Sequence, residues 1–258
     1  MRPEKLTFVC VVYRNDYDLV MRLMSSLGEF FKLDEIEELV LILNEPYNYV
    51  SNFQAFLAGI PNFGYKVTTY WSNELWPEQD SYDWYSQQML KILAAEKVNT
   101  SWYVIHDAKD YYIGHTDITH YFDQQGASYG CVNTYDPHKF GSGPGIFNDE
   151  YTRAYEIWGL DFRNHKSSFM LKYTTPFPVK TELIRDMIED LKSRFHGVFY
   201  RLLQLQINHK PLYTEFALIS AYLTFRGRIA QDYIHGWERS DTFTYRVKQS
   251  KDLRRRFV

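Results

Sequence analysis

Strand-like and helix-like segments alternate along the first half of the chain. A continuous apolar run covers Leu6–Tyr13, and the next segment, Tyr17–Phe31, places its leucines on one helical stripe. A second apolar run, Glu38–Leu43, stops before Pro46, because proline cannot continue a strand. This alternation is typical of a sheet built from βαβ units.

The alternation continues with a helix around Phe53–Leu57 and a strand around Tyr65–Tyr70. Tyr82–Val98 is rich in strong helix formers and predicts a long helix, which leads into a strand at Ser101–His106. The apolar run at Leu6–Tyr13 has no polar alternation, as expected of a strand that is buried on both faces. We therefore expect an α/β fold with a Rossmann-like mixed, mostly parallel sheet flanked by helices.

The second half is less regular and more helical. Short strands are expected near Tyr129–Asn133 and Phe169–Tyr173, and helices at Lys180–Phe195 and Tyr213–Phe225. Thr214 is a suitable N-cap for the last of these helices. The chain shows no linker, so we expect one domain over residues 1–258.

A polar loop is expected at Asp136–Asp149, with the sequence GSGPG at 141–145. It lacks the lysine and hydroxyl residue that end a phosphate-binding loop, so it is no P-loop. A passive connection and a mobile lid both remain open.

Composition narrows the class of protein. Hydrophobic residues make up 45% of the 258 residues and aromatic ones 18%, which is typical of an ordered globule. The two cysteines, Cys10 and Cys131, are too few for a disulfide framework or a thiolate metal site, and Cys10 is predicted to be a buried thiol. A reducing, cytoplasmic location fits, and no apolar run is long enough for a transmembrane segment.

The formal net charge of −3 argues against general nucleic-acid coating. The end of the chain, Lys248–Arg256, is nevertheless locally basic. It is either a solvated tail or a contact with a phosphate, a nucleic acid or an anionic membrane surface.

Acidic residues follow the strand Ser101–His106, at the edge of the sheet where α/β proteins bind ligands. Asp107 and Asp110 there are candidate ligands for a divalent cation that neutralises a leaving diphosphate, or they are ordinary turn residues. Lys109 between them offers positive charge that reduces the need for metal.

One face of the helix at Tyr82–Val98 carries Trp84, Gln88 and Lys91, which are spaced i, i+4 and i+7. These side chains are candidates to hold a polyphosphate and its sugar. The alternative is a solvated helix face, since glutamine and lysine are ordinary surface residues of helices.

Aromatic residues are frequent near the expected cleft. They are candidates for stacking on sugar rings or nucleobases, or else they belong to the core. The residues concerned are Trp71, Trp76, Trp84, Tyr111 and Tyr112.

Taken together and in order, the segments VVYRND, WYSQQMLK, YVIHDAKDYYI, TPFPVKTELI and YTEFALISAYL carry a family resemblance. The chain resembles, from about Leu6 to Leu223, a bacterial and phage family of glycosyltransferase-like proteins of largely unassigned specificity. Its members look like nucleotide-sugar transferases of the GT-A fold. The resemblance implies a GT-A-like fold, with residues 1–113 binding the nucleotide sugar and residues 114–258 binding the acceptor.

The resemblance also implies roles for particular residues. The ends of the first two strands would hold the base and ribose, the QQ-x-x-K helix would face the donor, and Asp107 matches the first aspartate of the Asp-x-Asp motif. The donor-binding residues implied or proposed in this way are Val12, Tyr13, Arg14, Asn44, Gln88, Lys91, Asp107 and Lys109.

The sequence departs from the family pattern at the metal site. Lys109 occupies the second aspartate position and Asp110 falls one residue later. Mn²⁺ or Mg²⁺ held by Asp107 and Asp110, with His235 as a further ligand, is therefore in doubt. An ammonium group at this position supplies charge directly, and we favour reduced metal dependence.

Glu215 and Asp110 are the candidate catalytic carboxylates. Glu215 matches an acidic residue late in the family pattern and can take the proton from an acceptor hydroxyl. The alternative for Glu215 is a structural role, because it follows the N-cap Thr214, where the helix dipole favours negative charge.

The expected function is transfer of a sugar from a nucleotide donor, UDP-sugar foremost, to a hydroxyl of a glycan or of a modified nucleobase in DNA. A degenerate transferase that only binds carbohydrate or nucleotide is one alternative. A sugar-phosphate nucleotidyltransferase is another, weakened because the turn YRNDYD lacks a glycine-rich basic loop.

Overall fold

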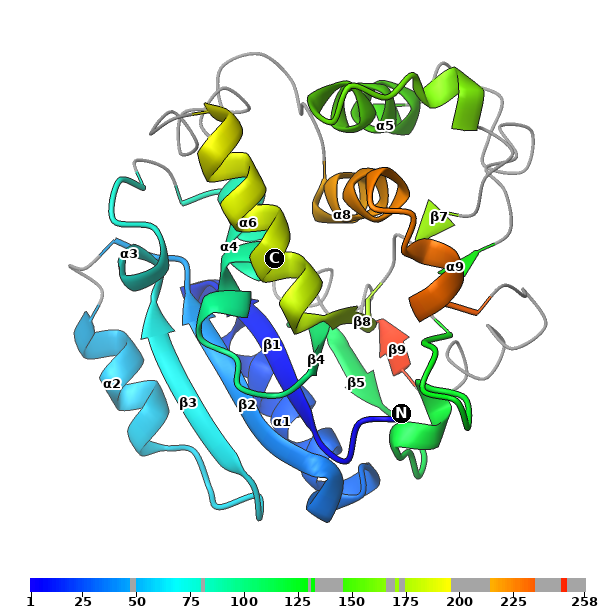
Figure 1. Ribbon diagram of the computed structural model, residues 1–258. Coiled ribbons are helices and arrows are strands. Elements are labelled where there is room, and N and C mark those ends of the chain that lie inside the picture. The colour runs from blue at the N-terminus through cyan, green and yellow to red at the C-terminus, as the bar shows by residue number, and fades with distance from the viewer. Residues whose placement is uncertain are drawn as a thin grey trace.

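A five-stranded mixed sheet forms the centre of the protein, which we describe from a computed structural model (Figure 1). The structure describes residues 1–46, 50–79, 82–129, 131–132, 146–165, 170–171, 175–195, 214–234 and 247–249. The strands, in spatial order, are β3 (Lys66–Trp71), β2 (Ile36–Leu43), β1 (Leu6–Val12), β4 (Trp102–Asp107) and β8 (Phe177–Lys180). Only β8 runs antiparallel to its neighbour, so the prediction of a mostly parallel Rossmann-like sheet is confirmed.

β1 lies in the middle of the sheet. It pairs in parallel with β2 on one side and with β4 on the other, through Val9 opposite Val40 and Ile105. All seven residues of β1 are buried, as the continuous apolar run predicts for a strand covered on both faces. Cys10 is among them and is a free, buried thiol, as expected.

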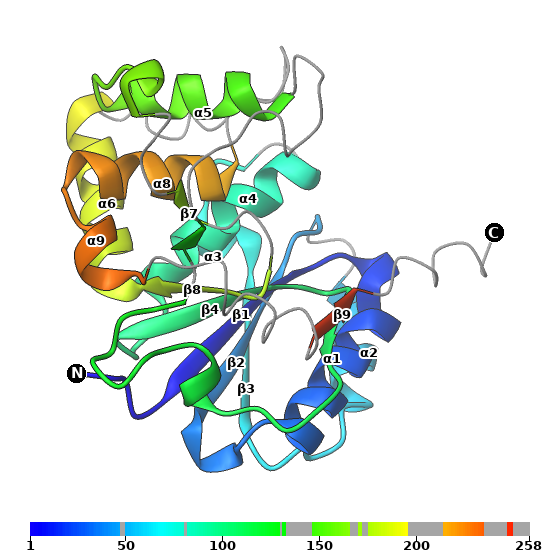
Figure 2. The same cartoon turned by 90° about the vertical axis from the view of Figure 1, so that its right-hand side faces the viewer.

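Helices cover both faces of the sheet, which Figure 2 shows edge-on: α1 and α2 lie on one side and α4 and α6 on the other. The bounds are α1 (Tyr17–Phe30), α2 (Val50–Ala58), α3 (Ser72–Leu75), α4 (Trp84–Leu93) and α6 (Thr181–Phe195). α4 begins two residues later than the predicted helix and tightens into a 3-10 turn at Ala94–Glu96. It packs against β1 and against α8 (Glu215–Phe225).

The second half adds a helical layer above the carboxyl edge of the sheet. α5 (Ile146–Ile157) packs on α8, and α9 (Ile229–Asp232) follows. Two small antiparallel pairs join β5 (Asp110–Tyr112) to β9 (Val247–Gln249) and β6 (Cys131–Val132) to β7 (Met170–Leu171). The hydroxyl of Thr214 accepts from the backbone N–H of Ala217 at 3.2 Å, which confirms the predicted N-cap of α8.

Two predictions for the second half are wrong in part. The loop Asp136–Asp149 ends early because α5 begins at Ile146, while 136–145, with GSGPG, lies outside the described residues. Lys180 ends β8 and does not open the following helix. The residues of the basic tail after Gln249 also lie outside the described part of the chain.

No helix among the described residues is both long enough and apolar enough to cross a membrane.

Candidate functional site

The strand order creates one switch point in the sheet, between β1 and β4. β2 and β3 follow on one side of β1, whereas β4 lies on its other side. The connections that leave such neighbouring strands diverge, and open α/β sheets bind ligands in the resulting crevice at the carboxyl edge. Tyr13 follows β1 here, and Asp107 is the last residue of β4.

Lys91 is the centre of a buried charge cluster at this edge. Its Nζ lies 2.7 Å from Oδ1 of Asp107 and 3.0 Å from Oε1 of Glu215, so it joins α4 to β4 and α8. The Lys91 side chain is only 2% exposed and that of Glu215 is fully buried. Burial disfavours the charged lysine, but the two carboxylates outweigh it and raise the pKa of Lys91.

Gln88 lies one turn before Lys91 and is also buried. Its side-chain amide faces the carboxylate of Glu215 and, with the nitrogen toward it, donates to both oxygens. The solvated helix face that the sequence left open is therefore wrong for Gln88 and Lys91. Burial raises the pKa of Glu215, and the neighbouring Lys91 opposes this shift.

Asp107 is held by two lysines. Its Oδ1 pairs with Lys91, and its Oδ2 lies 2.9 Å from Nζ of Lys109, which is 34% exposed. Burial of the carboxyl group favours its neutral form, but the ammonium groups of Lys91 and Lys109 prevail and hold the pKa of Asp107 well below its usual range. Asp107 is therefore ionised, and each of its oxygens has a cationic partner.

Asp110 opens β5 beside this cluster and is fully buried. Its Oδ2 accepts hydrogen bonds from the hydroxyl of Thr175 and, at 3.4 Å, from the backbone N–H of Asp107. Its Oδ1 has no hydrogen-bond partner among the described residues. Burial and the negative charge of Asp107 raise the pKa of Asp110 to about 7.

Glu150 is a further acidic residue of the site that the sequence reasoning missed. It lies on α5, is 2% exposed, and its Oε2 has no partner among the described residues. Burial and the charge of Glu215 raise the pKa of Glu150 to about 7. The signal was present in the spacing of Tyr151, Tyr155 and Trp158, which marks the buried face of a helix.

The ends of β1 and β2 form a second polar network. The amide nitrogen of Asn44 donates to the Tyr13 hydroxyl at 2.7 Å and to Ser86 Oγ at 2.9 Å, and its oxygen accepts from Gln79 at 2.6 Å. The hydroxyl of Tyr13 in turn donates to the backbone oxygen of Asp83. Asn44 thus ties the ends of two strands to the start of α4.

Burial at the ends of β1 and β2 limits which of the predicted donor-binding residues can contact a nucleotide sugar. The side chains of Val12 and Asn44 are fully buried, so neither presents a surface to a ligand in this arrangement. Arg14 is 42% exposed on its side chain and lies 3.6 Å from Glu45, and its backbone N–H donates to the same carboxylate. Arg14 and Tyr13 are therefore the members of this group that reach solvent at the end of β1.

The aromatic residues expected near the cleft differ in exposure, and Trp71 and Tyr111 are partly buried. Trp76 and Tyr112 are each 1% exposed and belong to the core, whereas Trp84 is 50% exposed at the start of α4. Trp84 lies one turn before Gln88 and two turns before Lys91, so it stands at the solvent end of the face of α4 that carries these two residues.

The carboxylates of Asp107 and Asp110 do not fit a divalent cation as ligands. Both oxygens of Asp107 are paired with ammonium groups, and Asp110 turns one oxygen to Thr175 and has a pKa near neutrality. Two ammonium groups beside the same carboxylate repel a cation placed there. Within the described residues no three His, Cys, Asp or Glu side chains are grouped as metal ligands, and His235 lies outside them.

Comparison with known proteins identifies a family whose function is unknown. No curated protein matches the chain. A profile described as a family of unknown function, DUF6492, matches residues 7–251, which is nearly the whole sequence. The chain therefore belongs to the DUF6492 family.

Proposed function

We propose that the protein is a glycosyltransferase that uses a nucleotide-sugar donor, UDP-sugar foremost. The main support is the cluster of Lys91, Asp107 and Glu215 at the switch point of the sheet, where a nucleotide can lie across the ends of β1 and β4. Burying the charged groups of Lys91 and Glu215 costs stability that a purely structural site does not require, and charged groups in such surroundings are enriched at functional sites.

The residues divide between donor and acceptor. Tyr13 and Arg14 border the crevice on the β1 side and are placed to flank the base and ribose. Lys109 is the partly exposed cation at the end of β4 and faces the expected position of the diphosphate. Gln88, Lys91 and Asp107 lie behind it as positioning residues.

In the transfer itself, an acceptor hydroxyl oxygen forms a bond to the anomeric carbon while the bond from that carbon to the diphosphate oxygen breaks. The hydroxyl proton passes to a carboxylate, and the electron pair of the broken bond leaves with the diphosphate. Asp110 is suited to take the proton, because its pKa near 7 lets it act at neutral pH and one of its oxygens has no hydrogen-bond partner among the described residues. Glu215 is the second candidate base, with a raised pKa but a lysine on one oxygen.

The acceptor is proposed only by class, as a hydroxyl of a glycan or of a modified nucleobase. We place the reaction in the cytoplasm, which is supported by the free thiol of Cys10. Trp84, half exposed beside the site, is the aromatic residue best placed to stack on a sugar ring or a base.

The test is mass spectrometry of the purified protein mixed with a panel of nucleotide sugars and crude acceptors. We expect release of a nucleoside diphosphate together with a product heavier by one sugar. Asp110→Asn should lower the rate by at least about 100-fold, the contribution of a general base, while the melting temperature shows that the fold is kept. Absence of both binding and turnover for every nucleotide sugar would refute the proposal.

A binding module without turnover is the second candidate. It is favoured by one observation, the complete burial of both candidate bases, Glu215 and Asp110, which leaves neither carboxylate a path to an acceptor in the present arrangement. Calorimetric binding of nucleotide diphosphates without any hydrolysis or transfer of the donor would support the module.

A further inference from the structure

Two lysines hold Asp107, and they differ in their surroundings. Lys91 reaches Asp107 from α4, is 2% exposed, and has a second carboxylate partner in Glu215. Lys109 reaches the other oxygen of Asp107 from the turn after β4, is 34% exposed, and has no carboxylate partner but Asp107 among the ion pairs of the described residues. Lys91 is thus fixed, whereas Lys109 is open to solvent on one side.

Asp107 does not depend on Lys109 for its charge balance. The carboxylate keeps its bond to Lys91 at 2.7 Å, so Asp107 stays charge-paired when Lys109 moves. An exposed lysine exchanges partners at little cost, because its pair with a carboxylate competes with water. Loss of Lys91, in contrast, strands Glu215 without a cation in a buried site.

From this asymmetry, and resting on the glycosyltransferase function proposed above, we propose that Lys109 binds the donor diphosphate in place of a divalent metal ion. Lys109 exchanges Asp107 for a phosphate oxygen, and Lys91 holds the charge of Asp107 throughout. The positive charge that balances the leaving diphosphate is therefore supplied by a side chain of the protein and not by a bound metal ion. Lys91 is a positioning residue in this arrangement and does not touch the phosphates.

The chemistry suits a lysine at this position. As the sugar leaves, negative charge grows on the diphosphate oxygen that loses its bond to the anomeric carbon. An ammonium group donates up to three hydrogen bonds to such oxygens and stabilises the charge where it develops. A divalent cation in the same place would meet two ammonium groups around Asp107, which repel it.

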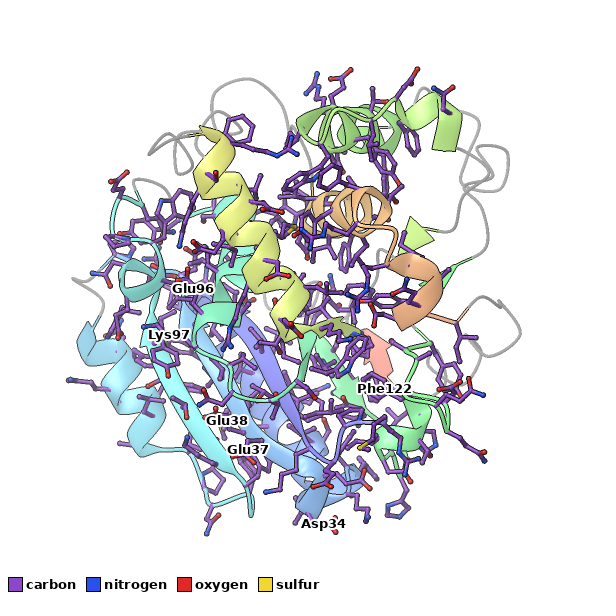
Figure 3. All side chains as sticks on the ribbon, in the orientation of Figure 1. Asp34, Glu37, Glu38, Glu96, Lys97 and Phe122 are labelled. Carbon is purple, nitrogen blue, oxygen red and sulfur yellow. The ribbon has the colours of Figure 1, made fainter. Side chains whose placement is uncertain are left out.

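The experiment is calorimetric binding of UDP, ADP and GDP to the full chain, first in EDTA and then with Mn²⁺. We expect one of these nucleotides to bind equally well under both conditions. Lys109→Gln should weaken that binding at least tenfold, with an unchanged melting temperature. Lys97→Gln is the matched control, since Lys97 follows the helical segment after α4 and stacks over Tyr70 at 5.3 Å, away from the site (Figure 3).

A second variant tests the reason for metal independence. Lys109→Asp creates Asp-Ala-Asp at 107–109 and removes the cation that competes with metal, so its nucleotide binding should appear only when Mn²⁺ is added. Wild-type binding that disappears in EDTA, or full affinity in Lys109→Gln, would overturn the role of Lys109 and leave the proposed function standing. Failure of all three nucleotides under both conditions would overturn both.

Discussion

Glu38 and Asp107 are carboxylates at opposite ends of the central sheet, and their ion pairs differ in how deeply the partners are buried. Glu38 pairs opposite Thr7 at the amino end of β1, whereas Asp107 pairs opposite Val11 at its carboxyl end. Glu38, labelled in Figure 3, is 5% exposed and lies 2.9 Å from Nζ of Lys66, which is 65% exposed. At the other end, Asp107 is 22% exposed and pairs with two lysines, one of which, Lys91, is itself buried and also pairs with the buried Glu215.

The comparison distinguishes an ion pair that only stabilises the fold, at Glu38, from a cluster with more buried charge than stability requires, at Asp107. Lys66 and Thr68 reach Glu38 from the adjacent strand β3, and the lysine keeps its ammonium group near water. The cluster at Asp107 gathers groups from α4, β4 and α8 and removes a cation from water as well. Removing both members of a pair from water, as in Lys91 and Glu215, costs more than removing only one, as in Glu38 and Lys66. Only the second cluster therefore suggests a function beyond stability.

The largest expected effect comes from removing the buried cation. Lys91→Met leaves Glu215 charged or protonated without its cation and should lower the free energy of unfolding by about 3 to 5 kcal/mol. Chemical denaturation followed by circular dichroism measures this change. A loss below about 1 kcal/mol would mean that the cluster is no more tightly coupled than a surface pair.

The double variant Lys91→Met with Glu215→Leu sharpens the result. It removes the pair together and leaves Asp107 with Lys109, so it should be less destabilised than the sum of the two single variants.

A pH-dependent effect is expected next, at Asp110. The pKa of Asp110 rises from 3.8 to about 7 in the folded protein, so between these values the folded chain keeps a proton that the unfolded chain releases. The contribution of Asp110 to stability therefore falls as pH rises from about 4 to about 7 and is constant above that. Asp110→Asn should gain stability relative to the wild type across the same window, as measured by urea denaturation at several pH values.

The pKa of Glu150 is also raised and that of Asp107 is lowered. Both residues are present in the wild type and in Asp110→Asn, so their own contributions to the pH dependence are subtracted when the two proteins are compared. A difference between Asp110→Asn and the wild type that does not change with pH would show that Asp110 is ionised in the folded state.

The smallest effect is expected at the amino end of the sheet. Lys66→Met removes an exposed lysine, and water replaces it near Glu38, which keeps its hydrogen bond from Thr68. The unfolding midpoint in urea should be nearly that of the wild type. A loss comparable with that of Lys91→Met would erase the distinction between the two clusters.

The sequence predicts the first half of the fold well because its strands are continuous apolar runs separated by amphipathic helices. It misses β8, because FPVK is short and carries Pro178, which argues against a strand. Pro178 is tolerated because β8 is the edge strand of the sheet and needs no second partner. α5 is missed because a glycine-rich stretch precedes it and polar residues dominate its surface.

For the site, the sequence predicts that Gln88, Lys91 and Asp107 face one donor, and the structure brings Lys91 and Asp107 into contact. Glu215 was expected only as a separate catalytic base, and its contact with Lys91 was not predicted. The sequence does not predict that Lys91 and Gln88 are buried, because neither residue type indicates burial and the covering helix α8 lies far along the chain. Their donor-binding roles stay predictions. Glu150 was missed for the same reason as α5, whose helix supplies it.

The distance along the chain between Lys91 and its second partner has a consequence for synthesis. Glu215 lies 124 residues after Lys91, on the helix α8, which is buried from Glu215 to Leu223. At translation rates of about 5 to 20 residues per second, Glu215 leaves the ribosome roughly 6 to 25 s after Lys91. Asp107 emerges early enough to pair with Lys91 first, so a nascent chain holds a half-built cluster until α8 arrives. Chains that end before α8 would therefore leave the apolar surface that α8 covers exposed and Lys91 without Glu215, and such incompletely folded chains are removed by chaperones and proteases.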